Sequence, residues 1–181
     1  IFNSTIHIDK GFTMKKRLTL IQMDVHVNDV EYNYNRVQEL LSQSLSENPD
    51  IIILPETWNT GFYPSRELIN ISDKNGERTK SLLSTFAKEH NVNIVGGSVA
   101  VAKNDVVFNT SYTYNRNGEL VGEYSKMHGF SPAKEDQYFA GGKHTTHFEL
   151  DGIPCSTVIC YDIRFPELVR MAALPGTELL F

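Results

Sequence analysis

The feature that most constrains the fold is an uninterrupted apolar run, IIIL, at residues 51–54. A strand that is apolar on both faces has to be covered on both faces, by helices or by a second sheet. Turn-forming residues, NPD at 48–50 and PE at 55–56, flank the run and limit it to a short strand. The chain therefore needs a layered fold built around this segment.

Helical patterns lie on both sides of the apolar run. Asp29 is a candidate N-cap for a helix that extends to about Ser46, and a second helix is expected from Arg78 to His90. The residues expected to face inward at helical spacing are Tyr34, Val37, Leu41 and Leu45 in the first helix and Leu82, Leu83 and Phe86 in the second.

Further strands are expected over residues 18–23, 92–102, 106–114, 120–126, 147–150 and 153–159, with a last helix at 165–174. The turn NRNG at 115–118 predicts a hairpin. Strands that alternate with helices early and late, with a hairpin between them, predict a mixed sheet covered by helices. The predicted fold class is α/β, in one domain without internal repeats.

Composition excludes several classes of protein. The 181 residues are 40% hydrophobic, and 17 Lys and Arg against 22 Asp and Glu give a net charge of −5. This balance predicts a globular protein and gives no basis for binding nucleic acid or an anionic membrane surface, which requires clustered positive charge. There is no apolar run long enough to span a bilayer. Two cysteines do not support a disulfide scaffold, so we expect a cytoplasmic protein.

Two further predictions concern the ends of the chain. Residues 1–13 lack the pattern of a secretory signal, and Met14 is a natural start, so we interpret residues 1–13 as an expression remnant or an extended start outside the fold. The segment TELLF at 177–181 is typical of the opening of a buried strand, which predicts that the domain continues past it. The Asn-x-Ser/Thr matches at Asn3, Asn70 and Asn109 carry little weight without secretion.

Three predicted strands end in a chemically reactive side chain: Glu56, Lys126 and Cys160. Ligands of open α/β sheets bind at the carboxyl ends of strands. Each residue also has an ordinary structural interpretation: a solvated loop glutamate, a solvated lysine at a strand end, and a small buried hydrophobe. For Cys155, inside a strand, we retain only the structural interpretation. The C-x-x-x-x-C spacing fits neither a redox nor a zinc motif, so no metal site is expected.

Cysteine–histidine catalysis is the competing arrangement. All six histidines precede Cys160, so a papain-like order with a downstream histidine does not occur in this segment. His128, two residues after Lys126, is expected to be a structural histidine or part of a pocket wall. Arg164 is expected to form a structural ion pair near Asp162 rather than to bind a substrate carboxylate.

The motifs around the three residues resemble the carbon–nitrogen hydrolase (nitrilase) superfamily. They are LPETWNTGFYP around Glu56, GEYSKMHGF around Lys126 and VICYDIRFPEL around Cys160, in the family's order Glu, Lys, Cys. A second family glutamate corresponds to Glu135 in SPAKEDQYFAGG. The resemblance covers residues 14–181, as a hydrolase domain incomplete at its C-terminus. One departure is Gly129, where the family often has leucine.

The resemblance implies a four-layer α-β-β-α sandwich and hydrolysis of a small linear amide through a cysteine thioester, without a metal or organic cofactor. Cys160 would be the nucleophile, Glu56 the base, and Lys126 with the backbone N–H of Tyr161 the oxyanion donors, while Glu135 would support Lys126 or the substrate. A homodimer through the helix at 165–174 is also expected.

The spacing of K-M-H-G-F and the following glutamate most resembles the ω-amidase-like branch, which favours 2-oxo acid amides. Two alternatives stay open. A nitrilase or N-carbamoyl hydrolase would use the same triad, and a non-catalytic interaction protein could share the same scaffold.

Overall fold

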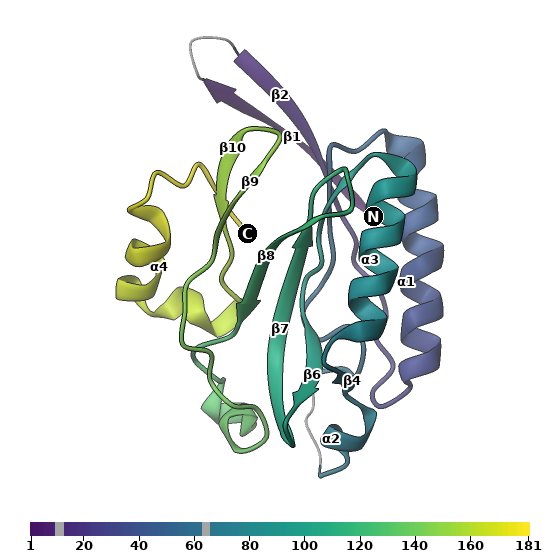
Figure 1. Ribbon diagram of the computed structural model, residues 1–181, viewed down its shortest axis with the longest axis vertical. Helices are drawn as coiled ribbons and strands as arrows, with labels where there is room; N and C mark the ends of the chain where they lie inside the picture. Colours follow the sequence, from purple (N-terminus) through teal and green to yellow (C-terminus); the bar gives the residue numbers. More distant parts are fainter. Residues whose placement is uncertain (10–12, 63–65) are drawn as a thin grey trace.

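The computed structural model describes residues 1–9, 13–62 and 66–181. Four layers follow one another across the molecule, as Figure 1 shows. Helices α1 (Val30–Ser44) and α3 (Glu77–His90) cover an eight-stranded sheet, a three-stranded sheet packs on its other face, and α4 (Pro166–Ala173) lies outside that second sheet. The predicted four-layer α-β-β-α sandwich is confirmed.

The large sheet is mixed, with strand order β1-β2-β3-β5-β7-β6-β4 and with β8 paired to β7. Strand β3 is parallel to both β2 and β5, whereas β7 is antiparallel to β5, β6 and β8. The strands are β1 (Phe2–Asp9), β2 (Thr13–Leu20), β3 (Ile51–Ile53), β4 (Asp73–Lys74), β5 (Asn93–Val95), β6 (Val99–Lys103), β7 (Val106–Tyr114) and β8 (Leu120–Ser125).

The small sheet has the order β11-β10-β9, with β11 parallel to β10. Its strands are β9 (His147–Leu150), β10 (Ile153–Ser156) and β11 (Leu179–Leu180). Strand β11 confirms the strand predicted at 177–181. The short helical elements are α2 (Leu68–Ile71) and the 3₁₀ turns η1 (Leu45–Glu47), η2 (Ser131–Ala133), η3 (Glu135–Gln137) and η4 (Cys160–Arg164).

The apolar run at residues 51–54 is covered on both faces, as predicted. Ile52 belongs to the core between the large sheet and the helices, which also contains Ile94 of β5. The neighbouring residue Ile51 belongs to a second core, between the two sheets, together with Val95. Successive residues of a strand point to opposite faces, so this strand contributes to both cores at once.

The two long helices form as predicted. The side chain of Asp29 caps α1 by accepting a hydrogen bond from the backbone N–H of Tyr32 at 3.1 Å. The residues expected to face inward lie in the core or pack against it, with Tyr34, Val37, Leu41, Leu83 and Phe86 buried and Leu45 and Leu82 partly buried.

The single strand predicted over residues 92–102 is wrong, because the structure breaks it into β5 and β6. Between them Gly97 adopts a φ of +58°. A Cβ atom at Gly97 would lie 2.0 Å from the carbonyl oxygen of Pro55. This close approach lets Ser98 donate a backbone hydrogen bond to Pro55, at 3.0 Å. The break therefore brings the backbone of residues 97–98 into direct contact with the segment that follows β3.

The N-terminal residues take part in the fold, contrary to the expectation that they lie outside it. Phe2–Asp9 form β1, which pairs antiparallel with β2 from Phe2 opposite Leu20 to Asp9 opposite Thr13. The resulting hairpin projects at the top of Figure 1. Within the described ranges, none of the helices has the length and hydrophobicity needed to cross a membrane.

Candidate active site

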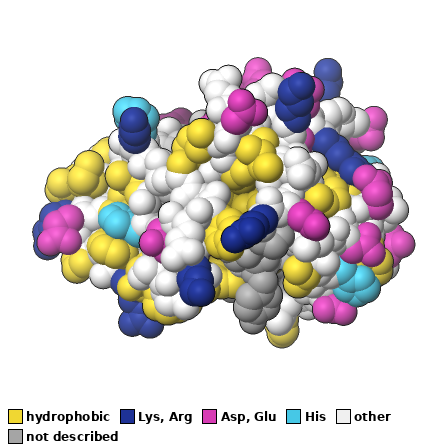
Figure 2. Space-filling view, turned by 90° about the horizontal axis from the view of Figure 1, so that it is seen from below, with side chains coloured by type: hydrophobic (Ala, Val, Ile, Leu, Met, Phe, Trp, Pro, Cys, Tyr) yellow, Lys and Arg dark blue, Asp and Glu magenta, His cyan; other side chains and the backbone are white. Residues whose placement is uncertain are grey.

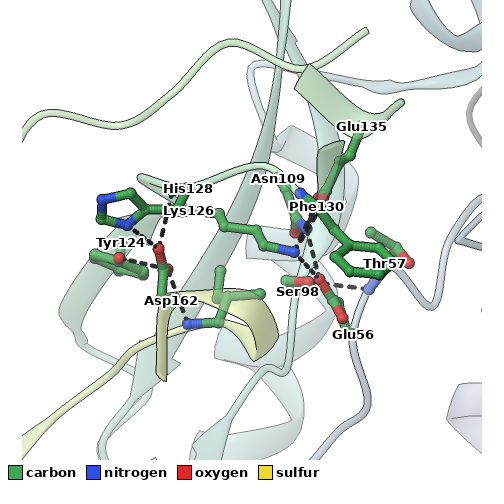
Figure 3. Close-up of polar contacts among 11 residues, drawn as sticks. Glu56, Thr57, Ser98, Asn109, Tyr124, Lys126, His128, Phe130, Glu135 and Asp162 are labelled. Atoms are coloured by element: carbon green, nitrogen blue, oxygen red, sulfur yellow. Dashed lines mark hydrogen bonds and ion pairs between the residues drawn. The ribbon is translucent and has the colours of Figure 1, made fainter. Parts of the chain in front are cut away.

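Glu56 and Lys126 meet at the end of the large sheet. Glu56 follows β3, and Lys126 directly follows β8, where its backbone N–H still donates to the carbonyl of Asn109 on β7 at 2.8 Å. This bond continues the β7–β8 ladder and fixes where the lysine side chain starts. The Lys126 ammonium reaches Oε1 of Glu56 at 2.8 Å, as drawn in Figure 3.

Glu135 completes an ionic cluster around the same ammonium group. Lys126 Nζ lies 2.8 Å from Oε2 and 3.1 Å from Oε1 of Glu135, and the Phe130 backbone N–H donates to Oε2 at 2.7 Å. The side chains of Lys126 and Glu135 are each only 2% exposed, whereas that of Glu56 is 22% exposed. The two predicted glutamates therefore both bond to one buried lysine, and Glu56 is the more accessible of the two.

Gly129 explains how the loop after Lys126 reaches Glu135. A Cβ atom at this position would lie 3.0 Å from the backbone nitrogen of Asp136. Glycine lets the loop pack directly on the turn η3, so that the next residue, Phe130, can donate to the Glu135 carboxylate. Gly129, the departure from the family pattern, thus lies beside Glu135.

The charge state of Lys126 follows from this surrounding. Burial acts to lower the pKa of a lysine, because it disfavours the charged form. The hydrogen bonds to Glu135 and Glu56 and their negative charges outweigh that effect, so the pKa of Lys126 lies above its ordinary value. The ammonium group is therefore a fixed positive charge at neutral pH.

Asn109 is part of this cluster and was not anticipated from the sequence. It is 1% exposed, and its Nδ2 donates to Oε1 of Glu56 at 3.0 Å and to Oε1 of Glu135 at 3.1 Å. The amide therefore links the two carboxylates on the side away from bulk solvent. A polar residue within the largely buried strand β7 was the signal that could have identified it.

Cys160 lies on a strained turn that faces the cluster. After β10 the chain continues through residues 157–159 into the 3₁₀ turn η4, which begins at Cys160, so the strand predicted to run to 159 ends at Ser156. The φ of Cys160 is +47°, in the left-handed region that non-glycine residues rarely adopt. Such strain is concentrated at functional sites, where a side chain is held in place by its surroundings. The sharp strand-to-helix turn predicted at Cys160 is confirmed.

The electrostatic surroundings of Cys160 include the cluster. Partial burial raises the pKa of the thiol, and the negative charge of Glu56 and a hydrogen bond with it act in the same direction. The positive charge of Lys126 acts the opposite way, and the net pKa is above the ordinary value. The thiol therefore responds to the charged groups of the cluster and keeps its proton in the resting state.

A hollow of about 590 Å³ opens beside Cys160. Its walls are Phe62, Phe130, Cys160, Tyr161, Ile163 and Arg164. The rings of Phe130 and Tyr161 are 5.1 Å apart in a T-shaped arrangement, and the Phe62 ring lies 5.9 Å from the Lys126 ammonium. A second, smaller cavity of about 130 Å³ lies against Cys160 and Glu56 on the side of Gly97 and Ser98. The hollow is large enough for a small organic molecule.

The remaining residues singled out from the sequence take structural positions. His128 is confirmed as a structural histidine, since its ring stacks on Phe165 at 3.6 Å and its Nδ1 lies 2.9 Å from Asp162. The expected pairing of Arg164 with Asp162 is wrong: among the described residues Asp162 bonds to Tyr124, His128 and Ile159, while Arg164 lines the hollow.

The second cysteine and the histidines do not form a competing site. Cys155 is 1% exposed and donates to the carbonyl of Ile153, so its structural interpretation is confirmed. Across residues 1–9, 13–62 and 66–181, no group of three or more His, Cys, Asp or Glu side chains could hold a metal ion.

Comparison with known proteins identifies relatives over most of this chain. The 2-oxoglutaramate amidase of Bacillus subtilis (strain 168) is 38% identical over 168 residues, which are 93% of this chain and 64% of that protein. Omega-amidase NIT2 of Danio rerio is 30% identical over 178 residues, 92% of this chain and 62% of that protein. The chain thus spans a little under two thirds of the length of these relatives.

A solved structure and a family description agree with these relatives. The NitN amidase from Neterenkonia sp. AN1 has a TM-score of 0.81 at 23% identity, over 91% of this chain and 65% of that chain, and so shares the fold. Residues 17–181, which contain all five predicted site residues, match the family described as Carbon-nitrogen hydrolase. The chain belongs to the carbon–nitrogen hydrolase family, and its relatives include proteins named as ω-amidases.

Proposed function

We propose that the protein hydrolyses a small linear amide, releasing ammonia and a carboxylic acid through a thioester on Cys160. The observation that supports this most directly is the ionic cluster, in which Glu56 and Lys126 lie 2.8 Å apart beside a cysteine on a strained turn. A base, a fixed cation and a nucleophile are the three groups that acyl transfer requires.

The first step would form the thiolate and attack the substrate. The raised pKa of Cys160 keeps the thiol protonated in the resting protein, so a base must take the proton as the sulfur attacks. Glu56 is the more exposed of the two carboxylates and contributes directly to that raised pKa. Sγ would bond to the amide carbon, the carbonyl electron pair would move to oxygen, and Glu56 would receive the thiol proton.

Lys126 would stabilise the oxyanion that results. An ammonium group has three donors. One reaches Glu56, and a second, shared between the two oxygens of Glu135, leaves the third for the oxyanion. The backbone N–H of Tyr161 is the second donor, because it lies in the first turn of η4, where backbone N–H groups have no partner within the helix. Glu135 then acts by positioning Lys126.

Collapse of the intermediate would release ammonia and leave the thioester. Glu56 would return its proton to the nitrogen as the carbon–nitrogen bond breaks. It would then take a proton from the water that attacks the thioester carbon, and pass it to the sulfur as the acid leaves. The same carboxylate therefore serves as base and acid in both halves of the reaction.

The hollow favours a substrate that carries a negative charge at its far end. Arg164 lines the hollow together with Cys160, and a guanidinium group binds carboxylates through two parallel hydrogen bonds. The names of the Bacillus and Danio relatives, 2-oxoglutaramate amidase and omega-amidase, agree with an amide of a 2-oxo acid as substrate. We therefore infer ω-amidase-like specificity.

The decisive experiment compares three substrate classes with the full-length protein. Ammonia release from 2-oxoglutaramate is expected to exceed release from an aliphatic nitrile and from an N-carbamoyl amino acid, and Cys160→Ala should abolish it. Arg164→Ala is expected to raise KM for 2-oxoglutaramate and to leave KM for a neutral aliphatic amide unchanged. Preferred turnover of the nitrile or the carbamoyl compound would reject the proposed substrate class. No turnover of any of them by a folded protein would favour a binding role.

We also propose a homodimer through the helix predicted at 165–174, which the structure has as α4. Ile163, Met171 and Leu174 are 63%, 54% and 74% exposed, and a hollow of about 680 Å³ lies among the apolar side chains of this region. Figure 2 shows hydrophobic side chains gathered at the left edge, the side on which α4 lies in Figure 1. Light scattering should give twice the monomer mass for the wild type and a monomer for Met171→Glu. Monomeric wild-type protein would reject the dimer.

A further inference from the structure

Asp162, two residues after Cys160, is fully buried and accepts four hydrogen bonds. Oδ2 accepts from the Tyr124 hydroxyl at 2.7 Å and from the Ile159 backbone N–H at 3.2 Å. Oδ1 accepts from the backbone N–H and from Nδ1 of His128, both at 2.9 Å. Its exposure is 0%, so every one of these bonds is shielded from water. Figure 3 shows the carboxylate at the centre of these donors.

The donors come from the two segments that carry the reactive groups. Tyr124 and His128 lie two residues before and two residues after Lys126, whereas Ile159 and Asp162 lie on either side of Cys160. Lys126 belongs to the large sheet, and Cys160 follows a strand of the small sheet. One carboxylate therefore ties the lysine segment to the cysteine turn across the boundary between the two sheets.

We propose that Asp162 is a positioning residue that sets the distance between the Lys126 ammonium and the Cys160 thiol. This inference rests on Cys160 being the nucleophile of the proposed function. The four bonds hold in place both the segment that carries Lys126 and the turn that carries Cys160. The strained φ of Cys160 persists because its neighbours in the chain are fixed. His128, which stacks on Phe165, supports the clamp by donating from Nδ1 and does not touch the substrate.

Asp162→Asn tests the proposal with almost no change of shape. An amide has one acceptor oxygen in place of two, so the backbone N–H of either Ile159 or His128 loses its acceptor. The bond with the Tyr124 hydroxyl or with His128 Nδ1 on the same side survives only if its direction reverses. Displacement of the nucleophile should lower kcat by about 100-fold, with little change in KM. Because the thiol then lies farther from the ionic cluster, the shift that Glu56→Gln causes in the pH midpoint of Cys160 alkylation by iodoacetamide should be smaller in Asp162→Asn than in the wild type.

The dependence on Glu56 separates positioning from a simple charge effect. If Asp162 acted on Cys160 only through its own negative charge, Glu56→Gln would shift the alkylation midpoint equally in the wild type and in Asp162→Asn. An equal shift in the wild type and in folded Asp162→Asn would therefore overturn the proposal.

Variants of the donors keep the test informative if Asp162→Asn does not fold. Tyr124→Phe removes one bond and keeps the ring, and Tyr112→Phe is its control, because the buried Tyr112 hydroxyl has no hydrogen-bond partner among the described residues. His128→Phe keeps a ring against Phe165 but loses the Nδ1 bond, whereas the side-chain amide of His128→Asn can donate in its place. The midpoint shift caused by Glu56→Gln should be smaller in Tyr124→Phe and His128→Phe than in the wild type, and should recover in His128→Asn.

An equal midpoint shift on Glu56→Gln in Tyr124→Phe and in Tyr112→Phe, or no recovery in His128→Asn, would also overturn the proposal. Alkylation needs no substrate. A protein that proves to hydrolyse none of the tested amides can therefore still confirm or refute the clamp, and the two proposals fail separately.

Discussion

Glu135→Gln removes one charge from the buried cluster without changing its shape, and we expect a large loss of stability. The carboxylate of Glu135 accepts from Lys126, Asn109 and Phe130. If the glutamine oxygen takes the place of Oε2, the amide nitrogen at the other position faces two donors, Lys126 Nζ and Asn109 Nδ2. The bonds from Lys126 Nζ and from Asn109 Nδ2 to this position are lost, and the amide N–H group of the glutamine faces two other donors.

The expected size of the effect follows from burial. Lys126 and Glu135 have side chains that are 2% exposed, so solvent cannot replace the missing partner. Breaking a buried pair by neutralising one member typically costs about 3–5 kcal/mol, because the remaining charge is left buried with less compensation. Urea denaturation at neutral pH should show this loss in the free energy of unfolding. The matched control is Asp136→Asn, the same chemical change at the exposed next residue, which should stay within about 0.5 kcal/mol of the wild type.

The pH dependence gives a second check on the same pair. Glu135 helps to hold the pKa of Lys126 above its ordinary value. A lysine with a raised folded pKa contributes stability that is fully present below the unfolded pKa of about 10.4 and is lost as pH rises through the folded pKa. The deficit of Glu135→Gln should therefore be constant from about pH 7 to 9 and shrink above about pH 10.4. A deficit under about 1 kcal/mol at neutral pH would refute this reasoning.

Three further predictions concern the thiol, a buried tyrosine and the chain break. Glu56→Gln should lower the pH midpoint of Cys160 alkylation, because the Glu56 charge raises the thiol pKa. Amide turnover should be lost in the same variant. A higher midpoint would contradict the assignment of Glu56 as the base. Burial raises the pKa of Tyr112, so the stability it contributes is present below about pH 10 and lost at higher pH. The tyrosinate absorbance that the wild type shows in excess of Tyr112→Phe should therefore appear together with unfolding, not before it. Gly97→Ala should lower the free energy of unfolding, measured by urea denaturation, by more than about 2 kcal/mol, because its Cβ atom would lie 2.0 Å from a carbonyl oxygen. Gly152→Ala should lower it by about 1 kcal/mol, because Gly152 has a φ of +74° but open space around it.

Sequence patterns predicted a mixed sheet covered by helices and the three reactive positions because both depend on local signals, whereas the four-layer arrangement was implied by the family resemblance. The doubly apolar run at 51–54 required two cores, and each core was found. Glu56, Lys126 and Cys160 were identifiable because each follows a strand, where the chain turns and displays a side chain. The family motifs then added Glu135, which lies in a loop without a strong local pattern.

The residues that the sequence did not reveal depend on contacts between distant segments. Asn109 was visible only as part of an Asn-Thr-Ser match, yet its amide connects two glutamates that are 53 and 26 residues away in the chain. Asp162 is 34 residues from His128, and nothing local predicts that pairing over one with Arg164. The break at Gly97 was missed because its cause, the carbonyl of Pro55, belongs to another segment.

The reactive groups do not share one sheet. Glu56, Asn109 and Lys126 are carried by the large sheet, whereas Cys160 follows β10 of the small sheet, and the core between the sheets separates their supports. Small shifts between the sheets would change the gap between Glu56, the proposed base, and Cys160, the proposed nucleophile, without breaking hydrogen bonds within either sheet. The proposed amide turnover should therefore be a sensitive reporter of tertiary packing. On gradual denaturation, activity should disappear before the circular dichroism of the helices and strands changes.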